Sequence, residues 1–157
     1  MTSVSVATTA HRPHLESFFK HYPASLASSR LDCYLSHNHT VIAQDGNQIV
    51  GILQWCLKED PSLGVVEFEE VFVTKDYQGQ GIGTRLVQFA LQEVLNYFQS
   101  ISLSPRKIFL FVSENNLSAR HLYEKFGFKQ TANVGNLFSN LTCELFYSLD
   151  LIPLNLG

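Results

Sequence analysis

The 157-residue chain has the length and composition of a globular protein. Apolar residues make up 45% of it and charged residues 16%, which excludes a disordered tail, and the length allows a core without disulfides or metals. The formal net charge of −3 provides no positive field for holding a nucleic acid, so we expect no nucleic-acid partner. We predict a single domain over residues 1–157.

Cysteine usage and hydropathy indicate the cytoplasm. Cys33, Cys56 and Cys143 are odd in number and lie among apolar or aromatic neighbours, as reduced core thiols do. No run approaches the roughly 18 apolar residues of a membrane span, and the first residues lack the apolar segment of a signal peptide. We therefore expect a soluble cytoplasmic protein without a membrane partner.

The N-terminal third predicts a strand, two helices and a hairpin. Residues 3–8 alternate like a strand, and Thr8 or Thr9 is placed to cap a helix through residues 14–22. A second helix is expected over residues 24–35. Asp45-Gly46-Asn47 then divides residues 39–57 into two strands of a hairpin, because Asp-Gly between alternating apolar residues favours such a turn.

The rest of the chain predicts strands that alternate with helices. Residues 65–73 indicate an antiparallel strand, and Gly83 to Gln99 carry the apolar stripe of a helix. A strand over residues 104–113 closes a strand–helix–strand unit, which favours parallel pairing. A short helix over residues 114–128, with Gly127 as a left-handed cap, precedes one or two strands around the 138–142 turn. The stripe consists of Val87, Ala90, Leu91, Val94 and Phe98.

The predicted fold class is α/β, a mixed, mostly antiparallel sheet of about six to seven strands flanked by about four helices.

The stretch "DYQGQGIGTRL", residues 76–86, joins a strand to a helix through three alternate glycines. Backbone N–H groups in such a turn converge on an anion, and the helix N-terminus adds about half a positive charge, so a phosphate is the expected guest. The alternative is a steric turn that only needs positive φ. Glycine spacing excludes a dinucleotide fingerprint, which needs glycine where Thr84 or Leu86 stands, and the Gly-Lys-Ser/Thr of a P-loop is absent.

Two motifs carry a family resemblance. Residues 71–86, "VFVTKDYQGQGIGTRL", resemble the acyl-CoA-binding signature of the GNAT acetyltransferase superfamily. Residues 115–128, "NNLSARHLYEKFGF", are similar to a later motif of that family. The resemblance covers residues 65–130 and implies a GNAT-like fold. The matching positions are Gln78, Gly81 and Gly83 in the first motif, and Asn116, Ala119, Leu122, Tyr123, Gly127 and Phe128 in the second.

The resemblance implies an acetyl-CoA site. The backbone of Val71, Phe72 and Val73 would pair with the pantetheine arm, and the amides from Gln78 to Arg85 would wrap the pyrophosphate. Gln78 stands where the family more often has Arg, so affinity would depend more on the backbone and on Arg85. The remaining cofactor-binding positions are Gly79, Gln80, Gly81, Ile82, Gly83, Thr84 and Asn116.

The resemblance also implies catalytic roles. Tyr123 would donate a proton to the departing thiolate; the alternative is a core tyrosine with a satisfied hydroxyl. Glu67, Glu69 and Glu70 are candidates for the base or the ammonium anchor, with Glu69 as first choice and at least one of the three on the solvated face. Strand parity puts Glu67 and Glu69 on one face and Glu70 on the other. The backbone N–H of Val73 or a neighbour would polarise the thioester carbonyl.

These roles predict acetyl transfer to a primary amine by direct attack in a ternary complex, since neither motif contains a cysteine. The three glutamates favour a small cationic or amino-acid-like amine over a protein N-terminus or lysine. A non-catalytic acyl-CoA-binding module and a nucleotide-binding regulator remain as alternatives, and similar proteins suggest a homodimer.

Four histidines have spacings that a metal could use, but no cysteine or carboxylate set completes a site, so no metal is expected. They are His11, His14, His37 and His39, and we expect exposed loop and cap positions for them.

Overall fold

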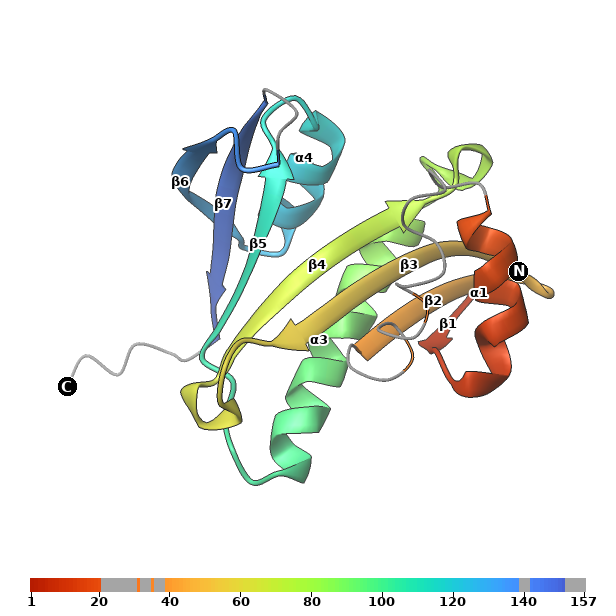
Figure 1. Cartoon of the computed structure of the whole chain (residues 1–157), viewed down its shortest axis with the longest axis horizontal. Helices are drawn as coiled ribbons and strands as arrows, with labels where there is room; N and C mark the ends of the chain where they lie inside the picture. Colours follow the sequence, from red (N-terminus) through yellow and green to blue (C-terminus); the bar gives the residue numbers. More distant parts are fainter. Residues whose placement is uncertain (21–30, 32–34, 36–38, 139–141, 152–157) are drawn as a thin grey trace. The chain divides into compact units, whose positions relative to one another are not determined.

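The computed structural model describes residues 1–20, 31, 35, 39–138 and 142–151. Its strands form a seven-stranded mixed sheet in the order β1-β2-β3-β4-β5-β7-β6 (Figure 1). The strands are β1 (Ser3–Val6), β2 (His39–Asp45), β3 (Gln48–Leu57), β4 (Val65–Val73), β5 (Lys107–Ser113), β6 (Lys129–Gly135) and β7 (Cys143–Asp150). The helices are α1 (Arg12–Phe19), α3 (Ile82–Ser100) and α4 (Leu117–Lys125).

This architecture confirms the predicted α/β class with its mixed sheet. The described residues contain three α-helices where about four were expected. The helix predicted over 24–35 lies outside the described residues except at positions 31 and 35, as do Cys33 and His37.

Contacts divide the chain into two compact units. The first unit comprises Met1–Cys56 and Glu69–Val94, and the second comprises Leu57–Phe68 and Leu95–Gly157. The single domain over residues 1–157 stays a prediction.

The first unit is built on the predicted hairpin. β2 pairs antiparallel with β1 and with β3, and the pairing of Asp45 with Gln48 leaves Gly46 and Asn47 as a two-residue turn. Gly46 has φ +58°, the left-handed conformation that this turn requires. The sequence signal of this hairpin is therefore confirmed.

Helix α1 and helix α3, whose residues up to Val94 belong to the first unit, bury the residues that their periodicity predicted. On α1, Leu15, Phe18 and Phe19 join the core, and the Phe18 ring lies 5.8 Å from that of Phe72 in β4. On α3, the predicted stripe is buried except for half-buried Leu91. One expectation needs adjustment: Thr8 does not cap α1 directly, because the 3-10 turn Thr9–His11 precedes that helix.

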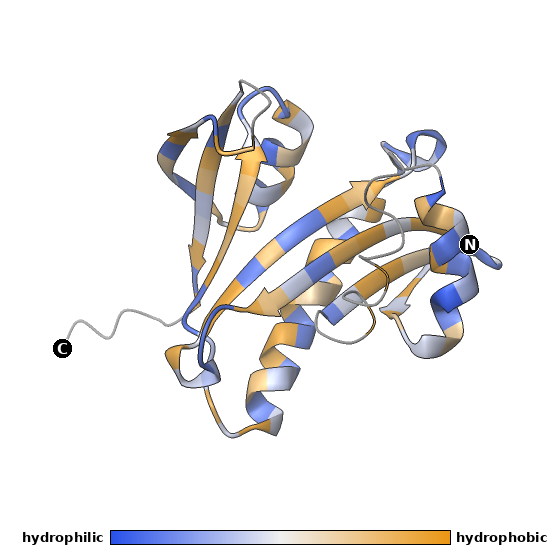
Figure 2. Ribbon diagram, viewed as in Figure 1, coloured by the Kyte–Doolittle hydropathy of each residue, from blue (hydrophilic) through white to orange (hydrophobic). Residues whose placement is uncertain are grey.

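The second unit contains the predicted parallel pair. Val65–Glu67 of β4 pair in parallel with Lys107–Phe109 of β5, and β7 lies antiparallel between β5 and β6. Figure 2 shows β5 as a nearly continuous apolar strand. This hydropathy fits a strand flanked by β4 and β7 in the sheet, with α4 against one face.

Helix α4 is shorter than the predicted range 114–128, but it has the predicted left-handed glycine cap. The Asn116 side chain caps it by accepting the Ala119 N–H at 3.1 Å. Gly127 follows with φ +89°, and the Phe128 N–H reaches the Tyr123 carbonyl at 3.2 Å, which closes the C-terminal turn.

Candidate functional site

The glycine turn in the first unit presents a row of backbone donors. Gly79 and Gly81 have φ of +74° and +76°, and α3 begins directly after them at Ile82. The first hydrogen bond into the helix is from the Arg85 N–H to the Gly81 carbonyl. Within the described part of the chain, the N–H groups of residues 79–84 have no acceptor. The positive end of a 19-residue helix and these donors make a site suited to an anion.

Side chains of the turn are tied to the backbone. Gln78 donates through Nε2 to the Val73 carbonyl at 2.9 Å, and Gln80 donates to the Asp76 carbonyl at 3.1 Å. Arg85 donates from Nη1 to the Thr2 carbonyl at 2.7 Å. Gln78, Gln80 and Arg85 thus each donate to a carbonyl of the protein, and a direct phosphate contact by Arg85 or Gln78 stays a prediction.

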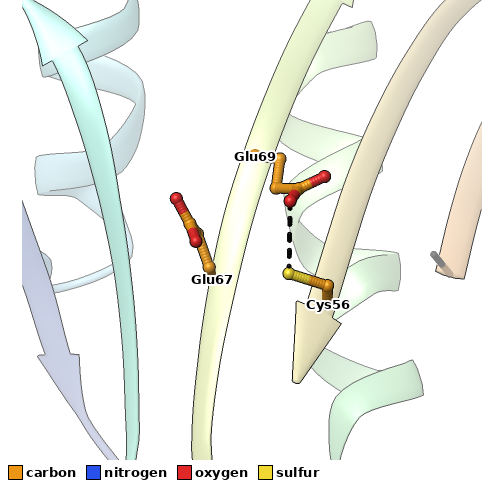
Figure 3. A group of neighbouring side chains, drawn as sticks. All are labelled: Cys56, Glu67 and Glu69. Atoms are coloured by element: carbon orange, nitrogen blue, oxygen red, sulfur yellow. Dashed lines mark hydrogen bonds between the residues drawn. The ribbon is translucent and has the colours of Figure 1, made fainter. Parts of the chain in front are cut away.

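The carboxylates of β4 differ in their surroundings. In the first unit Glu69 is exposed and accepts a hydrogen bond from the Cys56 Sγ at 3.3 Å (Figure 3). In the second unit Glu67 is only 18% exposed and pairs with Lys58, with 3.3 Å between Oε2 and Nζ. Glu70 is half-buried, as are Val71–Val73. Sequence reasoning missed Cys56, because only the approach of β3 to β4 brings its thiol to Glu69.

Tyr123 lies on α4 in the second unit. Its side chain is 6% exposed, its ring packs 5.7 Å from that of Phe128, and burial raises the pKa of its phenol. The Tyr123 hydroxyl makes no hydrogen bond to any residue that the structure describes. A buried phenol without a protein partner is available to a ligand.

Tyr147 on β7 is the contrasting case. Its buried hydroxyl accepts a hydrogen bond from Arg120 Nε at 3.2 Å and donates one to Glu124 Oε1 at 2.8 Å. Arg120 also donates to the Glu114 carbonyl at 3.1 Å. The core tyrosine with a satisfied hydroxyl is therefore Tyr147, which no sequence pattern singles out.

Histidines take structural positions among the described residues. The His11 ring lies 2.9 Å from the Thr8 N–H and 3.0 Å from its hydroxyl, as expected for a cap. His39 is not a loop residue: it lies in β2 and stacks on Trp55 at 3.7 Å, and burial lowers its pKa. Neither of these, nor His14, joins a group of three potential metal ligands in the described ranges.

The fold and the glycine turn define an α/β protein that offers backbone donors to an anionic ligand. The acetyltransferase (GNAT) domain family matches residues 36–130, more than half of the chain, and the chain belongs to this family. The GNAT signature read from residues 71–86 and 115–128 is thereby confirmed at the level of the family.

Named relatives match parts of the chain. The probable spermine N(1)-acetyltransferase of Bacillus subtilis subsp. natto is 32% identical over 71 residues, which are 45% of this chain and 43% of the relative. The spermine/spermidine N(1)-acetyltransferase of Bacillus subtilis strain 168 is 31% identical over 71 residues, with the same shares of 45% and 43%. Each match spans less than half the length of the relative.

A solved structure supports the fold. The ribosomal-protein-S18-alanine N-acetyltransferase from Escherichia coli aligns with a TM-score of 0.77 over 100% of this chain and 99% of that one, at 17% identity. Along the described residues, no helix combines the length and the hydropathy that crossing a bilayer requires.

Proposed function

We propose that the protein transfers the acetyl group of acetyl-CoA to a primary amine by direct attack in a ternary complex. The observation that carries this proposal is the row of backbone N–H groups at residues 79–84, which have no acceptor among the described residues, at the start of α3. A pyrophosphate supplies the acceptors that these donors lack. Because the chain belongs to the GNAT acetyltransferase family, we take acetyl-CoA to be the ligand that carries this pyrophosphate.

Each candidate residue then has a role. The pantetheine arm pairs with the backbone of Val71–Val73, which follows the part of β4 that pairs with β5. The pyrophosphate takes the N–H groups of the turn, and the Val73 N–H polarises the thioester carbonyl. Glu69 accepts the proton of the amine, and Tyr123 donates one to the sulfur.

Bonds and protons balance in this scheme. The amine nitrogen attacks the carbonyl carbon, the carbon–sulfur bond breaks, an amide forms, and coenzyme A leaves as its thiol. Burial keeps the Tyr123 phenol protonated until it donates, since desolvation raises its pKa.

The acceptor we propose is a small cationic amine. Two relatives are named for spermine or spermidine, and Glu67 and Glu69 supply negative charge along β4.

We further propose that the protein is located in the cytoplasm, and the free thiols of Cys56 and Cys143 agree with that location. We also propose that the protein forms a homodimer.

An amine panel tests the function. Purified protein is mixed with acetyl-CoA and amines from several classes, and coenzyme A release is followed together with acetyl-CoA binding by calorimetry. We expect release with cationic amines and faster turnover as the amine loses its proton. Binding of acetyl-CoA without release for any amine would favour the non-catalytic module, and absence of binding would refute the assignment of the turn.

A further inference from the structure

Three phenylalanine rings form a strip on one face of the second unit's sheet. Phe109 and Phe111 on β5 have ring centroids 6.2 Å apart, and Phe146 on β7 lies 5.3 Å from each of them. Neighbouring Tyr147 points to the other face, where its hydroxyl meets α4. This aromatic strip therefore lies on the face opposite α4, and Phe111 and Phe146 are only half-buried.

A buried carboxylate stands at one end of the aromatic strip. Glu144 shares its face of β7 with Phe146, two residues along, and pairs across the ladder with Ser113 of β5. Its side chain is 5% exposed, yet its partner is the neutral Thr142 hydroxyl, at 3.2 Å from Oε1. No cation of the described residues pairs with Glu144. A carboxylate in such surroundings strongly favours an arriving cation.

A second carboxylate, that of Glu67, lies toward the other end of the aromatic strip. Glu67 pairs in register with Phe109, so both side chains lie on the same face of the sheet. Along β5, the four steps from Phe109 to Ser113 offset the two carboxylates by roughly 13 Å in the strand direction. A staggered chain advances roughly 1.25 Å per bond, so about ten bonds cover that length.

We infer that the aromatic strip binds a linear polyamine, the acceptor of the proposed reaction, with Glu144 as counter-ion of an ammonium that is not acetylated. This inference rests on the proposed function. Methylene groups of the polyamine lie on the three rings, and an ammonium beside Phe146 and Phe111 gains cation–π attraction in addition to the Glu144 charge. The strip thus selects acceptors with two or more basic nitrogens, separated by a spacer long enough to cross the rings.

Two amines with the same eight-carbon chain test this selection. Octylamine and octamethylenediamine differ only in the terminal ammonium. For the wild-type protein we expect kcat/KM for the diamine to exceed that for octylamine by about tenfold or more, as for a charge-assisted hydrogen bond. Glu144→Gln should bring this ratio close to one by raising KM for the diamine, with octylamine kinetics unchanged. Phe146→Leu should lower the ratio severalfold.

The matched control is Glu124→Gln, which removes one carboxylate on the α4 side and should keep the wild-type ratio. A ratio near one in the wild type, or an unchanged ratio in Glu144→Gln, would overturn the inference. If Glu144→Gln does not fold by circular dichroism, Phe146→Leu decides alone. Should the wild type acetylate no amine, the proposed function fails, and calorimetry with spermidine still tests the strip: Glu144→Gln must weaken that binding.

Discussion

Removal of the Tyr123 hydroxyl should lower kcat without changing the free energy of unfolding. General acid catalysis contributes roughly 10²- to 10⁴-fold, so Tyr123→Phe should lower kcat by that order. The hydroxyl makes no hydrogen bond to the described residues, so the variant loses no internal bond. We therefore expect the free energy of unfolding to change by less than about 0.5 kcal/mol and acetyl-CoA affinity to remain.

Tyr147→Phe is the matched control and should behave in the opposite way. It removes the hydrogen bonds to Arg120 and Glu124 from a buried hydroxyl. At about 1 kcal/mol for each bond, the variant should lose about 1–3 kcal/mol of stability while kcat stays near the wild-type value. Coenzyme A release gives kcat, and urea unfolding gives the stability of both variants.

The test is whether Tyr123→Phe lowers kcat alone and Tyr147→Phe lowers stability alone. If Tyr123→Phe keeps kcat, or if Tyr147→Phe lowers it equally, the general-acid role is refuted. The pH profile gives a second check: burial holds the pKa of Tyr123 above its ordinary value of about 10, so kcat should show no descending limb below that pH. A descending limb below that pH that vanished in Tyr123→Phe would show that burial does not raise the pKa of Tyr123.

Three further predictions concern the first unit. Gly81→Ala and Gly46→Ala both place alanine at positive φ and should each cost about 1 kcal/mol of stability, but only Gly81→Ala should weaken acetyl-CoA binding by calorimetry, about tenfold. Glu69→Gln should lower kcat/KM for the amine by about 10²-fold or more with unchanged acetyl-CoA affinity; equal loss of both would make the role structural. Burial lowers the pKa of His39 in the folded state, so its contribution to stability is present above about pH 6.5 and is lost as pH falls. His39→Phe should therefore flatten the fall in melting temperature between about pH 7 and 5, and an unchanged slope would exclude His39 as its source.

Features encoded over short stretches could be predicted from the sequence. The turn at Gly46 follows from Asp-Gly between alternating apolar residues, and the buried face of α3 follows from its helical spacing. The parallel β4–β5 pair follows from the length of the connection between the strands. The first two features are determined by residues within one element or its turn, and the third by the length of one connection, so tertiary context only had to agree with them.

Features that depend on strand register could not be predicted in this way. The thiol of Cys56 meets Glu69 because β3 runs beside β4, and Tyr147 meets α4 because β7 lies next to β5. Glu144 shows the limit most clearly. Parity assigns its face, but only the structure reveals that this carboxylate is buried with a neutral partner.

The division into two units makes donor and acceptor recognition separable by experiment. The backbone donors proposed for the pyrophosphate belong to the first unit, whereas the aromatic strip and Glu144 belong to the second. Glu144 accepts a hydrogen bond from the hydroxyl of Thr142, which belongs to the same unit. Effects of substitutions without shared partners usually add. A Gly81→Ala, Glu144→Gln double variant should therefore show the acetyl-CoA affinity of one parent and the diamine ratio of the other, and a departure from additivity would show that the two sites are coupled.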